Sequence, residues 1–143
     1  MKYLWLFLFS FVVLAKSPNQ LILSGLLPPP LKDFKIHHTT LGEAQKALGK
    51  ADLTEGRFYY WEKNGLKYAL ELSFDEKFIL KTIHYTFTEK RPPLEKVGSI
   101  DVKKLTPYPS EGKSLGRFLQ LKEKEFEIII DPISKTIHTV KLL

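Results

Sequence analysis

Residues 57–87, RFYYWEKNGLKYALELSFDEKFILKTIHYTF, carry the strongest fold signal in the chain. Asn64-Gly65 stands between two runs rich in aromatic and branched side chains, and this dipeptide is typical of a two-residue β-hairpin turn. Such a turn pairs Trp61 with Tyr68 and Tyr59 with Leu70, and paired residues share one face of a sheet. A third strand follows after a tight turn at residues 75–77. The stretch therefore predicts a three-stranded antiparallel meander.

Alternation along these strands divides their side chains between two faces. The predicted core side carries Tyr59, Trp61, Tyr68, Leu70, Leu72, Phe74, Ile79, Ile83, Tyr85 and Phe87. The predicted outer side carries Phe58 and Tyr60 on the first strand, and Leu80, Thr82, His84 and Thr86 on the third. Asp75 stands where its side chain can cap backbone N–H groups of the turn, and Asp131 has the same position later in the chain.

A helix is predicted just before this meander, in TTLGEAQKALG. Thr40 is a suitable N-cap, and Glu43 three residues later completes a capping box. Leu41, Ala44 and Leu48 recur on one face, and Gly49 ends the helix. The predicted fold class is therefore α+β, an antiparallel sheet with helices packed on one face.

Two short sequences occur twice in the same order, which predicts an internal repeat. Gly56-Arg57-Phe58 returns as Gly116-Arg117-Phe118, and the tetrapeptide KTIH occupies both 81–84 and 135–138. We interpret KTIH as the start of the last strand of a unit, with its isoleucine in the core. Residues 39–90 and 91–143 are then two helix-plus-three-strand units, and whether they share one sheet stays open.

The predicted second unit is a weaker copy of the first. Arg91-Pro92-Pro93 reads as a linker. GSIDVKKL is a candidate short helix with Ser99 as its cap. Three strands follow, with turns near 124–125 and 131–134. Four side chains are expected to face the core: Leu119, Leu121, Ile128 and Ile130.

Residues 1–15, MKYLWLFLFSFVVLA, resemble a signal peptide. Lys2 precedes an apolar run, and Val13 and Ala15 meet the requirements of a signal-peptidase site, so cleavage is expected after Ala15. A membrane anchor is the rival interpretation, but a spanning helix needs about 20 apolar residues and this run is about a dozen long. Residues 16–38 form a proline-containing lead-in. Residues 21–27 are expected to pack loosely or to form an edge strand, and residues 28–30 to be extended.

Composition limits the partners. The chain has 143 residues, no cysteine and a formal charge of +6. The absence of cysteine excludes disulfides, thiol chemistry and lipid attachment through a thiol. Lysines alternate with glutamates, as in LKEKE, which is typical of a solvated mixed-charge surface. We expect no nucleic-acid partner and no transmembrane span, and only mild attraction to anionic envelope polymers.

Catalytic and metal motifs are lacking. His37 and His38 adjoin the helix cap, while His84 and His138 are expected to be solvent-exposed strand residues. No H-x-x-x-H or H-E-x-x-H spacing is present, and no serine lies in a G-x-S-x-G turn. We therefore expect no catalytic residue, metal or cofactor, and the chain is not expected to be an enzyme. A small hydrolase remains as a third class of function.

The capped helix T-x-x-E-x-x-x-x-L-G, followed by a hairpin and by Phe74-Asp75 before the last turn, resembles the SmpA/BamE-like small envelope proteins. It is similar also to the tandem modules of β-lactamase inhibitory protein. The match covers about residues 36–87, with a degraded echo in 98–142. The lipid-anchoring cysteine of BamE and the proline that commonly follows the helix glycine are absent. The resemblance implies a non-catalytic module that binds proteins or envelope components through its sheet.

Phe58, Tyr60 and His84 are the candidate partner-binding residues. By the predicted register, Tyr60 lies opposite Ala69, and His84 lies beyond Ala69 on the next strand, which makes a shallow slot with an aromatic wall. Either residues 21–27 or the second unit cover this face, or it is exposed to a partner.

The expected function is a periplasmic or secreted binding module. It would scaffold or inhibit another envelope or secreted protein through its sheet face. The alternative is a basic module that binds anionic polymers of the cell envelope. Binding to such a polymer should weaken steeply with salt, whereas an aromatic protein interface should tolerate salt.

Overall fold

The structure is a computed structural model that describes residues 18–63, 66–98, 101–109 and 118–143. Its α-helices are α2 (Pro18–Leu26), α3 (Pro29–Lys32) and α4 (Leu41–Leu48), and its 3₁₀ helices are η1 (Leu94–Val97) and η2 (Val102–Lys104). Its strands are β1 (Leu53–Glu55), β2 (Phe58–Lys63), β3 (Leu66–Phe74), β4 (Leu80–Thr86), β5 (Thr106–Pro107), β6 (Leu119–Lys122), β7 (Phe126–Asp131) and β8 (Thr136–Leu142). The fold is α+β, as the sequence predicts. The predicted signal peptide, residues 1–15, lies outside the described residues.

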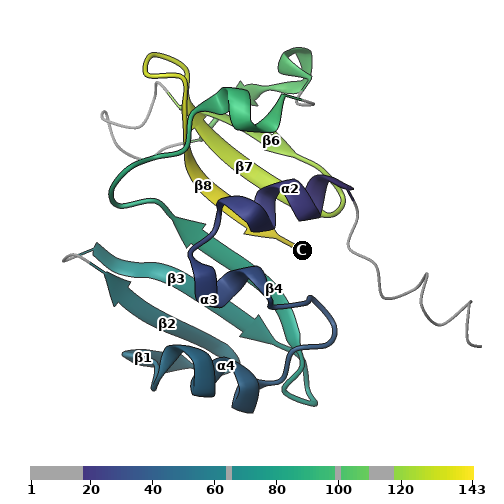
Figure 1. Ribbon diagram of the computed structural model, residues 1–143, viewed down its shortest axis with the longest axis vertical. Helices are drawn as coiled ribbons and strands as arrows, with labels where there is room; N and C mark the ends of the chain where they lie inside the picture. The colour runs from purple at the N-terminus through teal and green to yellow at the C-terminus, as the bar shows by residue number, and fades with distance from the viewer. Residues whose placement is uncertain (1–17, 64–65, 99–100, 110–117) are drawn as a thin grey trace, which may run out of the picture.

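All the strands form one antiparallel sheet, in the order β1-β2-β3-β4-β8-β7-β6-β5. The meander β2-β3-β4 and the meander β6-β7-β8 meet in the middle of the sheet (Figure 1), where Tyr85 of β4 pairs with Val140 of β8. Both residues belong to a single apolar core cluster. The two halves of the chain therefore share one sheet and one core.

The first hairpin has the predicted faces but a different register. Lys63 pairs with Leu66, as a two-residue turn requires, but an irregularity before Lys63 then pairs Trp61 with Leu70 instead of Tyr68. The shift amounts to an even number of residues, and side chains alternate with a period of two, so each residue keeps its face. Trp61 is buried with only 9% of its surface exposed, and the side chain of Tyr68 is outside the described residues.

A β-bulge reverses two assignments on β4. Ser73 pairs with Thr82 while Phe74 pairs with Leu80, so Lys81 is an extra residue without a partner on β3. An extra residue moves its neighbour to the other face. Leu80 is consequently fully buried in the core, where the sequence predicted an outer position, and Ile79, predicted in the core, is half-buried.

The helix α4 forms as predicted. The Thr40 hydroxyl accepts a hydrogen bond from the Glu43 N–H at 3.2 Å, and the Glu43 carboxylate accepts one from the Thr40 N–H at 2.8 Å. Gly49 follows with a φ of 79°, which favours glycine. Its carbonyl accepts a hydrogen bond from the Trp61 indole at 3.3 Å, which joins the end of α4 to β2.

The lead-in is helical, and the prediction of a loose or extended segment was wrong. Pro29 and Pro30 occupy the first positions of α3, where a missing N–H costs nothing. Leu23, Leu27 and Leu31 follow one another at four-residue spacing, and each is about 2% exposed. The lead-in therefore contributes to the main core, and its helices lie on the same face of the sheet as α4 (Figure 1).

The tandem repeat of helix-plus-meander units is not confirmed. Where the sequence predicts a second helix, the described residues form only the short η2, and Ser99 lies outside them. Residues 116–117 of the second Gly-Arg-Phe match are also outside the described part. The predicted strands are present, with Leu121, Ile128 and Ile130 buried and Leu119 partly buried. The predicted linker joins the sheet, because the Pro92 carbonyl accepts a hydrogen bond from the Ile137 N–H at 2.8 Å.

Within the described part of the chain, none of the helices has the length and apolar character needed to cross a membrane.

Candidate functional site

The sheet has a core face, covered by α2, α3 and α4, and an outer face on the opposite side (Figure 1). Tyr59 and Trp61 point into the core, so Phe58 and Tyr60 point to the outer face. Phe58 is 45% exposed and Tyr60 is half-buried. The lead-in does not cover these aromatic side chains, because it packs on the core face.

In the structure, Glu71 lies between Tyr60 and His84, although the sequence predicted it opposite Phe58. Tyr60 pairs with Glu71 on β3, and Glu71 pairs with His84 on β4. The predicted partner of Tyr60 was Ala69, and the two-residue shift in the first hairpin replaced it. Phe58, predicted opposite Glu71, pairs with Ser73 instead. The three candidate residues thus surround Glu71 and Ser73 rather than an alanine slot.

The row of Tyr60, Glu71 and His84 continues across the second half of the sheet. His84 pairs with Lys141, Lys141 with Glu127, and Glu127 with Lys122. We call these residues, from Tyr60 to Lys122, the outer ladder. Opposite charges that face each other across strands stabilise a sheet register. The sequence alone missed this ladder, because it depends on the pairing of β4 with β8, which local pattern does not specify.

Small side chains lie deep between the larger members of the outer face. Ala69, Ser73 and Thr139 are nearly fully buried there, although they do not belong to the main core cluster. The Ser73 and Thr82 hydroxyl groups are hydrogen-bonded to each other, and the hydroxyl oxygens of Thr86 and Thr139 lie 3.5 Å apart. The outer face therefore includes small side chains that are nearly inaccessible to solvent as well as larger, exposed ones.

The surroundings of His84 lower the pKa of its imidazole and so favour the neutral form. Burial is the main cause that lowers the pKa of its imidazole, and the Lys141 ammonium acts in the same direction. The carboxylates of Glu71 and Glu127 oppose this shift. A neutral imidazole both donates and accepts a hydrogen bond, which suits recognition of a polar partner group.

A second group of side chains lies on the outer side of the β7–β8 half. His138 packs against the buried ring of Phe118 at 4.9 Å between centroids, and its Nδ1 lies 2.7 Å from the Thr139 hydroxyl. The Arg91 guanidinium lies 6.0 Å from the centre of the Phe118 ring and 3.9 Å from the Asp131 carboxylate. Burial and Arg91 both lower the pKa of His138. These contacts hold the 91–93 segment and the start of β6 against β8.

The expectation of solvent-exposed strand histidines was wrong, since His84 and His138 are both half-buried. His37 and His38, before α4, are exposed. Among the residues that the structure describes, no three His, Cys, Asp or Glu side chains gather in a way that could hold a metal ion.

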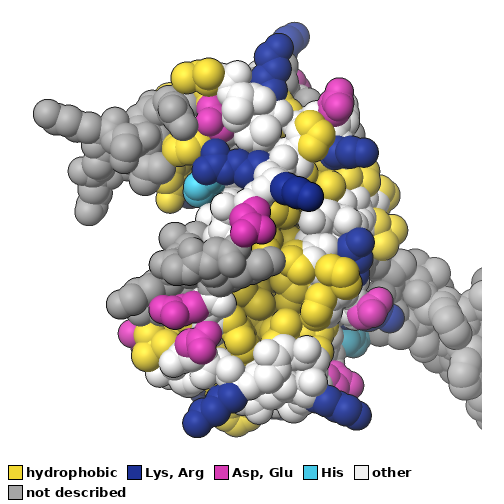
Figure 2. Space-filling model, turned by 60° about the vertical axis from the view of Figure 1, so that its left-hand side comes forward, with side chains coloured by type: hydrophobic (Ala, Val, Ile, Leu, Met, Phe, Trp, Pro, Cys, Tyr) yellow, Lys and Arg dark blue, Asp and Glu magenta, His cyan; other side chains and the backbone are white. Residues whose placement is uncertain are grey.

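The core side of the sheet offers a different kind of surface. Figure 2 shows apolar side chains gathered around a hollow on the side of the molecule, with Lys and Arg interspersed among Asp and Glu over the rest of this view. A cavity of about 290 Å³ lies between residues 26–29 and the end of β4, where Tyr85 and Phe87 form an edge-to-face pair at 5.0 Å. Both rings are nearly buried, so they form the floor of the cavity.

A comparison with protein-family models, with curated proteins and with solved structures found no match to this chain. The resemblance to SmpA/BamE-like proteins and to β-lactamase inhibitory protein consequently remains a prediction from the sequence.

Proposed function

We propose that this protein is a non-catalytic binding module of the cell envelope or of the secreted fraction, and that it scaffolds or inhibits another protein through the outer face of its sheet. The observation that carries the proposal is the position of Phe58, Tyr60 and His84. They lie on neighbouring strands of a face that the helices leave open, and Phe58 is 45% exposed there. Aromatic side chains in a central patch contribute strongly to protein interfaces.

The outer ladder favours a protein partner over an anionic polymer. Its charges alternate along Glu71, Lys141, Glu127 and Lys122, and the lowered pKa of His84 favours an uncharged imidazole between Glu71 and Lys141. A polyanion is best bound by a run of positive charge, whereas an alternating row matches a protein surface that carries the opposite alternation. Export through a signal peptide at residues 1–15 remains part of this proposal.

The test compares variants on the two sides of the molecule. Tyr60→Ala and Phe58→Ala should keep the thermal stability of the parent chain, because both side chains lie outside the core. Each should weaken binding to a partner recovered from an envelope extract, with Tyr60→Ala costing about 2 kcal/mol, or roughly 30-fold in affinity.

Phe78→Ala is the matched control. Phe78 is 48% exposed, an exposed fraction similar to that of Phe58. It lies instead in the β3–β4 turn, where its carbonyl accepts a hydrogen bond from the Leu41 N–H of α4. The Phe78→Ala variant should bind the partner as tightly as the parent chain does. If all three variants are stable and bind as tightly as the parent chain, the binding surface lies elsewhere and the proposal fails. Loss of binding between 50 and about 300 mM salt would instead support the polymer alternative.

A further inference from the structure

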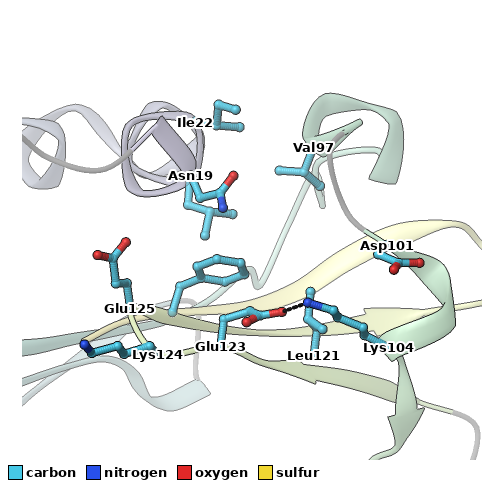
Figure 3. A pocket seen from close by; sticks show the side chains of 11 residues that line it. Asn19, Ile22, Val97, Asp101, Lys104, Leu121, Glu123, Lys124 and Glu125 are labelled. Carbon is cyan, nitrogen blue, oxygen red and sulfur yellow. Dashed lines mark hydrogen bonds and ion pairs between the residues drawn. The ribbon is translucent and has the colours of Figure 1, made fainter.

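A cavity of about 390 Å³ lies on the core side of the sheet, separate from the outer face. It is bounded by α2, by η1, by the residues around η2 and by the β6–β7 turn (Figure 3). This volume falls within the range of about 300–1,000 Å³ that is usual for small-molecule sites.

The interior of this cavity is apolar. Leu121 and Phe126 of the sheet form its floor, and Leu23 of α2 and Val97 of η1 form its walls; each of the four is nearly fully buried. Ile22 stands at the rim with 39% of its surface exposed, although isoleucine favours burial. An apolar group placed between Ile22 and the floor would shield that side chain from water.

The rim of the cavity carries more negative than positive charge, although the chain as a whole is basic. Lys104 lies 3.2 Å from the Glu123 carboxylate, so these two charges neutralise each other. Lys124 points away from the cavity in Figure 3. Asp101 stands on the η2 side, and Glu125 stands on the opposite side, below α2 (Figure 3).

We propose that this cavity binds a small organic amine with an apolar body. The apolar body lies on Leu23, Leu121 and Phe126, where burial of its surface drives binding. The ammonium group lies at the Glu125 side, where the carboxylate accepts its hydrogen bonds. A carboxylate of the same shape is repelled by Glu125 and by Asp101, so the cavity discriminates by charge.

The test uses three probes with the same ring and similar length: 2-phenylethylamine, 2-phenylethanol and 3-phenylpropionate. Each is titrated into the full chain and followed by the backbone amide signals of residues 97, 121–123 and 126. The amine should bind with a dissociation constant of about 1 mM or below, as ligands of this size allow. The alcohol should bind about fivefold more weakly and the carboxylate more weakly still. Equal binding of the alcohol, or tighter binding of the carboxylate, would overturn the proposal.

Variants of the rim locate the site. Glu125→Gln keeps the shape of the side chain and should weaken amine binding about fivefold, while leaving the alcohol unchanged. Lys124→Gln is the control and should stay within about twofold of the parent chain. Ile22→Trp fills the cavity from an exposed position and should abolish binding of all three probes. Unchanged amine binding in Glu125→Gln would contradict the proposal whether or not Ile22→Trp folds.

Discussion

The β3–β4 and β7–β8 hairpins, one in each half of the sheet, have the same turn geometry. In the first, the Asp75 carboxylate accepts hydrogen bonds from two turn N–H groups at 2.8 and 3.0 Å. In the second, Asp131 accepts two at 3.0 and 3.4 Å. A residue with positive φ then leads into the returning strand, Phe78 at 57° and Lys135 at 54°.

Both hairpins continue with a β-bulge, at Lys81 in β4 and at His138 in β8. The residue before each bulge, Leu80 or Ile137, is fully buried. This correspondence does not align the two KTIH sequences, because His138 matches Lys81 rather than His84. The isoleucine of each KTIH is buried, as predicted, but the two isoleucines occupy different positions in their hairpins. Turn and bulge geometry are therefore a better guide to equivalence here than a shared tetrapeptide.

The two halves differ in what covers them. The first half holds α4, with its capping box and its link to Trp61, whereas the second half lies under α2 and η1. Two similar three-stranded meanders are thus covered by different helices.

The largest effect is expected at Trp61, which anchors α4 to the first half. Trp61→Ala removes a buried indole and its hydrogen bond to the Gly49 carbonyl, and should lower the free energy of unfolding by about 3–5 kcal/mol. Urea denaturation measures this loss. Ile133→Ala, at a position 75% exposed in the β7–β8 turn, should change it by less than about 0.5 kcal/mol. A loss below about 1 kcal/mol for Trp61→Ala would show that α4 does not depend on this contact.

Truncation of the buried residue before each bulge should lower the free energy of unfolding by a similar amount in the two halves. Leu80→Ala and Ile137→Ala should each cost about 2–5 kcal/mol, because both side chains are fully buried before a bulge. Ile79→Ala, at a half-buried position, should cost only about 1 kcal/mol. The unbulged register expected from the sequence predicts the opposite order for Leu80 and Ile79. The same denaturation series distinguishes them, and a larger loss at Ile79 would rule out the bulge at Lys81.

Loss of the capping box of α4, in the first half, should lower the free energy of unfolding by a smaller amount. Thr40→Ala removes the hydroxyl that accepts a hydrogen bond from the Glu43 N–H, and should cost about 1 kcal/mol. Thr40→Ser keeps a hydroxyl and should lie within a few tenths of a kcal/mol of the parent chain. Equal losses in both variants would mean that packing of the threonine methyl group, and not the cap, matters.

The smallest effect is a pH dependence from the two half-buried histidines. Burial lowers the pKa of His84 and His138 from the ordinary value of 6.5, so the unfolded chain binds more protons than the folded chain between the lowered pKa and 6.5. Their contribution to stability is complete above pH 6.5, falls as the pH drops through this window and levels off below it. Unfolding at a series of pH values should show this fall, and His84→Gln with His138→Gln should flatten it. An unaltered slope in the double variant would assign the pH dependence to other groups.

Local sequence accounted for much of the fold. The Thr40 capping box, the division of Tyr59 and Trp61 from Phe58 and Tyr60, and the capping role of Asp75 were all predicted correctly. Each depends on contacts within a few residues along the chain, where spacing and side-chain chemistry suffice.

The candidate site was predicted only in part. The sequence placed Phe58 and Tyr60 on the outer face, but it did not place Glu71 between Tyr60 and His84. That neighbour depends on an irregularity in the β2–β3 register, which the Asn64-Gly65 turn signal does not reveal. The helical lead-in was missed because three prolines suggest extended chain, and their position at the start of a helix becomes favourable only when Leu27 and Leu31 have a core to enter.

By itself, then, the sequence of this protein determined which side chains of the first hairpin share a face and where α4 begins and ends. The tertiary structure alone decided that β4 and β8 pair, that Leu80 enters the core, and that Glu71, His84, Lys141 and Glu127 form one row. The physical reason is distance along the chain. A cap or a turn satisfies its hydrogen bonds locally, whereas strand partners that are far apart in the sequence are selected by the burial of a shared core.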